Sequence, residues 1–215
     1  KYNSWVHVDG AFGLWASASS KYRYLTDGVD QADSWATDGH KWLNVPYDCG
    51  YGFTAHHEAH HRAMSQAASY LTHLKESRDQ MDWNPEFSRR GRGFSTYAAI
   101  RELGKTGIQN LINRTCEHAY SIVSQIGELP NVEIIALPVI NQGLIRFKDP
   151  NATDDTAHDA YTEEIIRKIN LTGEAFFQPT TYKGKRCMRV SVSGWRTNEE
   201  DVRRTVEIVR NVVIK

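Results

Sequence analysis

Two short apolar stretches that each end in an acidic residue constrain the fold of this chain more than any other feature. Residues 5–8 predict a buried strand with Asp9 at its carboxyl end, and residues 32–37 predict a second strand that is closed by Asp38. The chain between them, over residues 14–23, has the character of a short helix or a loop. Ligand-binding side chains gather at the carboxyl ends of strands in open α/β sheets. The pattern therefore predicts an α/β fold with a ligand site at this edge.

Lys41 follows the second of these strands and lies between His40 and Trp42. The amine of a lysine can hold an aldehyde as a Schiff base, and a carboxylate can keep a pyridine nitrogen protonated so that the ring withdraws electrons. Lys41 and Asp9 are therefore candidate ligands of pyridoxal 5'-phosphate (PLP). Taken alone, Lys41 is better explained as a surface lysine and Asp9 as a turn residue. The two together with their neighbours favour the cofactor site.

Several sequence blocks together resemble the PLP-dependent group II amino-acid decarboxylase family, which includes the aromatic-amino-acid, histidine and glutamate decarboxylases. The blocks are residues 5–13, 32–34, 38–43 and 46–50, with further similarity over residues 83–104. The resemblance extends over essentially the whole chain. Because the identity and the spacing of several blocks agree, it is specific to the family, although not to a substrate.

The resemblance implies an α/β fold class of the aspartate aminotransferase fold type, or fold type I. Residues 1–94 are expected to form the C-terminal part of the PLP-binding large domain, and residues 95–215 a small α+β C-terminal domain. Gly104 is predicted to end a helix, and residues 182–185 to form a turn. Helices are predicted over residues 95–103, 107–127, 154–169 and 198–213, and strands over residues 51–55, 132–137, 143–147, 175–179 and 187–193.

Four residues are expected, by resemblance, to contact the cofactor. Lys41 would hold PLP as a Schiff base, and Asp9 would contact the pyridine nitrogen. Ala11 would pack against one face of the ring, where only a small side chain leaves room for a flat cofactor. His40 would lie beside the phosphate and donate a hydrogen bond to it, although a purely structural histidine explains this position equally well.

Two further residues bear on the type of reaction that the resemblance implies. Tyr70 resembles the tyrosine of the family's mobile catalytic loop, which protonates the substrate carbon after carbon dioxide leaves. Arg89 resembles the arginine that grips the substrate carboxylate, since a guanidinium fits a carboxylate through two hydrogen bonds. The alternatives stay open, because a loop tyrosine can pack on a neighbour. Arg90 and Arg92 are close enough in sequence to be confused with Arg89, and any one arginine in such a cluster is more often a surface ion-pair partner.

The predicted activity is a lyase reaction, the PLP-dependent decarboxylation of an L-amino acid to the amine and carbon dioxide via a Lys41 Schiff base. Another fold-type I PLP enzyme, either a different lyase or an aminotransferase, is the nearest alternative. A catalytically inactive half-chain acting in dimerisation is a second. The chain enters a strand by Trp5, and the family has a further half before this point, so we expect an upstream N-terminal half as a partner. The resemblance also implies a homodimer.

The segment His56–His61 contains four histidines, and residues 57–61 have the His-Glu-x-x-His spacing of a zinc site. Two histidines four residues apart on a helix can share a metal ion. However, no third ligand motif follows, and the cofactor site already accounts for the neighbouring blocks. We therefore expect no catalytic metal here.

The composition narrows the range of partners and compartments. The 215 residues include 26 basic and 26 acidic side chains, so the formal net charge is zero, whereas a nucleic-acid partner requires a basic excess. No apolar run approaches the roughly 18 residues of a membrane span, so no membrane partner is expected. The three cysteines are widely spaced and form neither a disulfide framework nor a metal motif, which favours a reducing cytoplasm.

Overall fold

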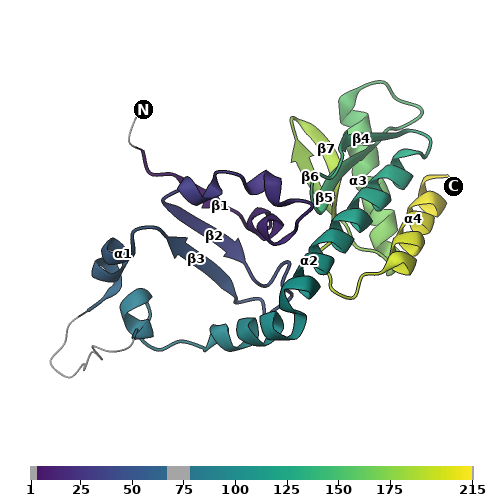
Figure 1. The fold of residues 1–215 in the computed structure, drawn as a ribbon. Coiled ribbons are helices and arrows are strands. Elements are labelled where there is room, and N and C mark those ends of the chain that lie inside the picture. The colour runs from purple at the N-terminus through teal and green to yellow at the C-terminus, as the bar shows by residue number, and fades with distance from the viewer. Residues whose placement is uncertain (1–3, 67–77, 215) are drawn as a thin grey trace. The chain divides into compact units, whose positions relative to one another are not determined.

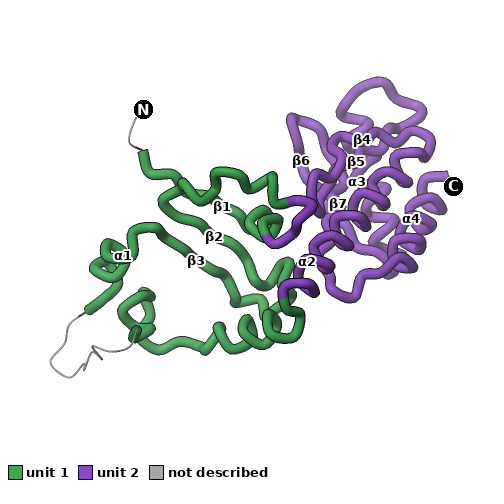
Figure 2. The backbone as a smooth tube through the Cα atoms, in the orientation of Figure 1, with its two compact units in different colours: residues 1–17, 23–104 green, residues 18–22, 105–215 purple. Residues whose placement is uncertain are grey.

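The computed structural model describes residues 4–66 and 78–214 and has a mixed α/β architecture (Figure 1). It divides into two compact units (Figure 2). Unit 1 comprises residues 1–17 and 23–104, and unit 2 comprises residues 18–22 and 105–215. No helix among the described residues is long and apolar enough to cross a membrane.

Unit 1 contains a three-stranded sheet in the order β1-β2-β3. The strands are β1 (His7–Asp9), β2 (Ser34–Asp38) and β3 (Gly50–Thr54). The first pair is parallel, with Asp9 opposite Ala36, and β3 runs antiparallel to β2. Because β1 and β2 are parallel, Asp9 and Asp38 lie at the same edge of the sheet, as predicted.

The first strand differs from its prediction in burial. The apolar residues 5–8 predict a buried strand, but His7 and Asp9 are exposed and Trp5 is 60% exposed. The physical reason is the strand order, since β1 pairs with β2 alone among the described strands.

The connections of unit 1 are short helical turns. Residues 14–23 were predicted as a short helix or loop and form parts of two 3₁₀ turns, η1 (Gly13–Ala18) and η2 (Arg23–Thr26). The remaining turns are η3 (Val29–Gln31) and η4 (Gln80–Trp83). The histidine-rich segment forms the helix α1 (His57–Met64).

Helix α2 (Arg92–Gly127) joins the two units and is interrupted at Gly104. This glycine has φ 60° and ψ −177°, a backbone conformation open essentially to glycine alone. The prediction that Gly104 ends one helix and that a second follows is therefore confirmed. The first helical part begins at Arg92 rather than at the predicted Ser95.

Unit 2 is built on an antiparallel sheet in the order β4-β5-β7-β6. Its strands are β4 (Val132–Ala136), β5 (Gln142–Phe147), β6 (Gln178–Tyr182) and β7 (Lys185–Ser191). The turn between β6 and β7 is Lys183-Gly184, with φ values of 48° and 79°, as a tight two-residue hairpin requires. The predicted turn over residues 182–185 is confirmed.

The predicted strand over residues 175–179 was wrong in its start, because β6 begins only at Gln178. The amide N–H of Phe177 donates to Asn170 Oδ1 at 2.8 Å, and Asn170 Nδ2 donates to the Phe177 carbonyl at 2.9 Å. Both backbone groups of Phe177 are thus taken by one side chain and cannot pair with a strand.

Two helices complete unit 2, α3 (Asp155–Leu171) and α4 (Glu199–Val213). The side chain of Asp154 caps the first, and a capping box around Asn198 starts the second. The core draws apolar side chains from α3, α4, the second part of α2 and the sheet. Its members include Ile122, Ile126, Ile145, Phe147, Ile165, Ile169, Val206 and Val209.

One charged side chain is buried within this core region. Arg146 on β5 is 1% exposed and forms ion pairs of 2.6 Å with both Asp155 and Asp159 on α3. A buried guanidinium needs such partners, because removing one of them leaves a charge without compensation. The three residues therefore tie α3 to the sheet at a fixed position.

Candidate PLP site

The turn after Asp9 is held against β2 by backbone hydrogen bonds. The N–H of Gly10 donates to the Ala36 carbonyl at 2.8 Å, and Thr37 Oγ1 donates to the Gly10 carbonyl at 2.8 Å. The N–H of Ala11 donates to Asp9 Oδ1 at 3.3 Å. The Asp9 side chain remains exposed at the end of its strand, so its carboxylate is available to a ligand.

Lys41 is positioned by both the turn after β1 and the end of β2. Its Nζ forms an ion pair with Asp38 Oδ2 at 2.7 Å and lies 5.1 Å from the centre of the Phe12 ring. The next residue, Trp42, is 1% exposed and packs edge-on against the same Phe12 ring at 5.9 Å. The structure thus brings Lys41 next to the segment that follows Asp9, with the lysine side chain one-third exposed.

The carbonyl of Cys49 accepts three hydrogen bonds from the turn that carries Lys41. The backbone N–H groups of Gly39 and His40 donate to it at 3.1 and 3.3 Å, and His40 Nδ1 does so at 3.3 Å. The His40 ring also lies 4.5 Å from that of Tyr47. A hydrogen bond from His40 to a phosphate would therefore have to come from Nε2 of the doubly protonated ring.

The start of α2 fixes the segment that carries Cys49. Arg92 Nε donates to Asp48 Oδ2 at 3.1 Å, and Arg90 Nη1 donates to Asp48 Oδ1 at 3.4 Å. The Cys49 thiol contacts the Arg92 carbonyl at 3.6 Å. Sequence reasoning assigned no role to Asp48 or Arg92, although both lie in blocks that carried the family resemblance.

Tyr51 makes a second connection between β3 and α2. Its hydroxyl is hydrogen-bonded to Thr96 Oγ1 at 2.7 Å, and burial raises the pKa of this phenol. The ring also lies against Gly39, where a Cβ atom would stand 2.6 Å from Cζ of Tyr51. Only glycine fits this position without a shift, which explains the residue between Asp38 and His40.

A separate network ties the opposite end of the sheet together. Ser34 Oγ accepts a hydrogen bond from Trp5 Nε1 at 2.8 Å and bonds to His7 Nδ1 at 2.7 Å. Asp33 Oδ1 lies 2.8 Å from His56 Nε2, and this hydrogen bond holds the pKa of Asp33 below its usual value. These contacts align β1 with β2 and so fix the edge at which Asp9 lies.

The structure says less about the two residues that were predicted to determine the reaction type. Arg89 is exposed, donates a hydrogen bond to Asn84 and lies 3.8 Å from Glu86. Tyr70 lies outside the described residues. In the part of the chain that the structure describes, no group of three or more His, Cys, Asp or Glu side chains could hold a metal ion.

Comparison with solved structures shows the fold that this arrangement belongs to. The structure of Oryza sativa TDC with PLP and tryptamine matches 99% of this chain with a TM-score of 0.90 at 23% identity. That of mouse CSAD matches 97% with a TM-score of 0.87 at 18% identity. The chain spans 45% and 46% of those two chains.

Curated relatives agree at the level of sequence. Tyrosine decarboxylase 2 of Arabidopsis thaliana is 25% identical over 98% of this chain and 39% of its own length. Histidine decarboxylase of Mus musculus is 27% identical over 96% of this chain and 30% of its own length. The aromatic-L-amino-acid decarboxylase of Drosophila lebanonensis is 26% identical over 94% of this chain and 49% of its own length. The chain thus spans between about a third and a half of these relatives.

A family model completes the comparison. The pyridoxal-dependent decarboxylase conserved domain matches residues 1–149, which contain Asp9, Lys41 and every contact described around them. The match extends over more than half of the chain, and the sequence-based identification of the family is confirmed. This chain belongs to the pyridoxal-dependent decarboxylase family.

Proposed function

We propose that this chain supplies the lysine and the acid of a PLP-dependent amino-acid decarboxylase, which converts an L-amino acid to the amine and carbon dioxide. The observation that carries the proposal is that Asp9 and Asp38, the ion-pair partner of Lys41, end neighbouring parallel strands at one edge of the sheet. Phe12, three residues after Asp9, is in contact with Lys41. Family membership supports the same reaction.

The residues present fit this cofactor by their chemistry. A primary amine that is one-third exposed can form an imine, and an exposed carboxylate can accept a hydrogen bond from a pyridine N–H. Ala11 adds the small side chain that a flat ring needs. When bound, PLP supplies a protonated ring that takes up the electron pair left by departing carbon dioxide.

The chain's own residues would divide the remaining tasks. Lys41 holds the cofactor, and Asp38, 2.7 Å from Nζ, stabilises the ammonium whenever the lysine is released. Asp9 would keep the pyridine nitrogen protonated, and His40 would donate a hydrogen bond to the phosphate. Arg89 holds the substrate carboxylate through its guanidinium.

The final proton transfer is assigned to Tyr70. A phenol that is brought in by loop closure can donate a proton to the substrate carbon and exclude water while it does so. This assignment comes from the family resemblance of the segment around Tyr70, and the reaction type depends on it. An aminotransferase would give a keto acid instead of an amine, so product analysis separates the two.

Further features of the whole protein are part of the proposal. The short sheet of unit 1, with its exposed Trp5 and Val6, is suited to further strands from an upstream N-terminal half. The proposed division is a large-domain part over residues 1–94 and a small C-terminal domain over residues 95–215. We also propose a homodimer and a cytoplasmic location.

Borohydride reduction followed by peptide mapping tests the central assignment. Protein that contains this chain and its upstream half is incubated with PLP, reduced and digested. The expected result is a pyridoxyl adduct on Lys41 that is absent from the Lys41→Arg variant. The control variant is Lys148→Arg, at an exposed lysine directly after β5, and it should keep the adduct. An adduct on a different lysine, or none, would overturn the proposal.

Activity then distinguishes the remaining alternatives. Released carbon dioxide with a stoichiometric amine supports decarboxylation, and a keto acid supports an aminotransferase. A protein that carries the Lys41 adduct but turns over none of the aromatic, acidic or imidazole amino acids would favour an inactive half-chain that acts in dimerisation.

A further inference from the structure

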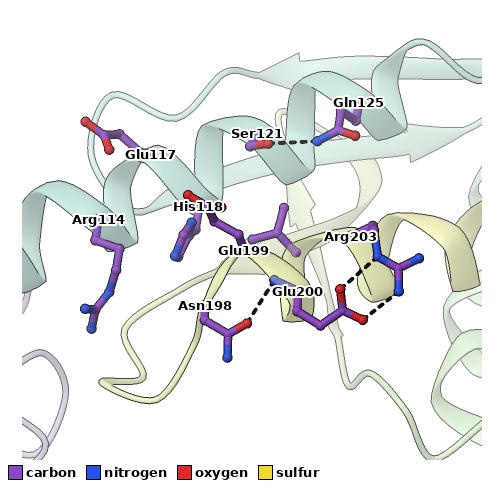
Figure 3. A pocket seen from close by; sticks show the side chains of 10 residues that line it. Arg114, Glu117, His118, Ser121, Gln125, Asn198, Glu199, Glu200 and Arg203 are labelled. Atoms are coloured by element: carbon purple, nitrogen blue, oxygen red, sulfur yellow. Dashed lines mark hydrogen bonds and ion pairs between the residues drawn. The ribbon is translucent and has the colours of Figure 1, made fainter.

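A pocket of about 690 Å³ lies within unit 2, between the second part of α2 and the start of α4 (Figure 3). Arg114, His118 and Ser121 line it from α2, at spacings that place them on one face of the helix. Asn198 and Glu199 line it from the start of α4. None of the residues assigned to the PLP site lines this pocket, so it is a separate feature of the molecule.

His118 is the buried polar side chain of the pocket. It is 7% exposed, and its Nε2 has no hydrogen-bond partner among the described residues. Burial, followed by the charge of Arg114, lowers the pKa of His118. A neutral imidazole with its proton on Nδ1 offers Nε2 as an acceptor, and this atom is unused within the described residues.

Two charged side chains beside this histidine have no opposite charge as a partner in the described part of the chain. Arg114 donates from Nη2 to the neutral carbonyl of Trp195 at 2.8 Å. Glu199 lies in the first turn of α4, and its carboxylate acts on the pKa of His118 in the direction opposite to Arg114. In Figure 3, His118 and Glu199 lie between α2 and the start of α4, and Arg114 lies one turn nearer the start of α2, with its guanidinium directed toward the segment that precedes α4.

The other charges around the pocket are already compensated. Glu117 forms an ion pair of 2.9 Å with Lys21. Arg203 is bound by Glu200 at 2.6 Å and by Glu207 at 3.1 Å. The groups left over are therefore one cation, one anion and one neutral acceptor. A ligand that matches them carries a carboxylate, an ammonium and no net charge.

We propose that this pocket binds a small zwitterion, a free amino acid, with its carboxylate on Arg114 and its ammonium on Glu199 and His118 Nε2. A simple anion would leave Glu199 facing negative charge, and a simple cation would face Arg114. Charge-assisted hydrogen bonds on both sides favour the zwitterion over either half of it. The inference is independent of the proposed decarboxylase reaction, because it uses no residue of the PLP site.

The test is a titration of the folded chain without PLP, so that an amino acid cannot react at Lys41. The probes are glycine, methylammonium and acetate, which carry both charges, the cation alone and the anion alone. The imidazole resonances of His118, assigned with a His118→Gln variant, report binding at this pocket. Glycine is expected to shift them saturably, and each of the other probes to bind at least about tenfold more weakly.

Variants locate the two charges. Glu199→Gln and Arg114→Gln are each expected to weaken glycine binding about tenfold or more, whereas Glu128→Gln, an exposed acid just after α2, leaves it unchanged. Thermal unfolding of each variant shows that the fold is retained. His118 resonances that do not respond to glycine would overturn the proposal. So would acetate binding as tightly as glycine, or glycine affinity that is unaffected by Glu199→Gln.

Discussion

Replacing Gly39 by alanine should damage the turn that presents Lys41 through a single steric contact. The added Cβ would stand 2.6 Å from Cζ and 2.9 Å from Cε2 of Tyr51, far inside van der Waals distance. Either the tyrosine ring or the backbone of the turn must therefore move. The ring is held by the 2.7 Å hydrogen bond from Tyr51 to Thr96, and the turn by the hydrogen bond from Gly39 N–H to the Cys49 carbonyl.

The size of the effect follows from these two alternatives. Forcing extra atoms into a packed site costs about 1–3 kcal/mol. Losing one hydrogen bond when the ring moves adds roughly 1 kcal/mol. We expect Gly39→Ala to lower the free energy of unfolding of unit 1 by about 2–4 kcal/mol. The yield of pyridoxyl adduct on Lys41 should fall with it, because the turn is displaced.

Urea unfolding followed by tryptophan fluorescence measures the stability, and peptide mapping after borohydride reduction measures the adduct. The matched control is Gly52→Ala in β3, where a Cβ would meet no atom within 4 Å. The double variant Gly39→Ala, Tyr51→Ala lacks the tyrosine ring and so lacks the clash. Its loss of stability should therefore be smaller than the sum of the losses in the two single variants. The reasoning is refuted if Gly39→Ala behaves like Gly52→Ala, or if the double variant is as unstable as the sum of the singles.

Three further predictions concern unit 2. The hydrogen bond from Arg146 holds the pKa of Asp155 below its usual value, so this carboxylate stabilises the fold above its unfolded pKa of about 4. The contribution is lost as the pH falls through the lower folded pKa. Asp155→Asn should therefore reduce the fall of the urea midpoint at acidic pH, and an unchanged fall would contradict this. Burial raises the pKa of Cys116 to about 12, so iodoacetamide at pH 8 should label it only after denaturation, and rapid labelling of the folded chain would refute its burial. Asn170→Ala removes both side-chain hydrogen bonds to Phe177 and should cost roughly 1–3 kcal/mol by thermal or urea unfolding, with Asn151→Ala in a surface turn as the control.

The elements of the fold were predictable where local chemistry determines them. Gly104 was expected to end a helix, and its positive φ shows why a residue without a Cβ stands there. The hairpin at Lys183-Gly184 and the helix cap at Asn198 are likewise determined by residues that are close together in the sequence. The start of β6 was not predictable, because the side chain that occupies the Phe177 backbone belongs to a helix seven residues earlier and leaves no trace in the periodicity.

The candidate site divides in the same way. Lys41 and Asp9 were proposed from the sequence because their chemistry is distinctive and each follows an apolar strand. Asp48 and Arg92 were missed because their role exists only through a contact between residues 44 positions apart. An aspartate in a loop and an arginine before a helix are common, and nothing in either residue type indicates that together they hold the carbonyl that shapes the Lys41 turn.

The two acids at the strand edge illustrate how structure assigns roles that sequence leaves equivalent. Asp9 and Asp38 end neighbouring parallel strands and lie at the same edge of the sheet. Asp38 is committed to the lysine by a 2.7 Å ion pair, whereas Asp9 bonds, among the described residues, only to the N–H of Ala11 in its own turn at 3.3 Å. Two carboxylates in different environments can serve different functions. The free acceptor capacity of Asp9 suits a ligand N–H, and the pairing of Asp38 suits a counter-ion for the amine, which supports the proposal that Asp9 rather than Asp38 would contact the cofactor ring.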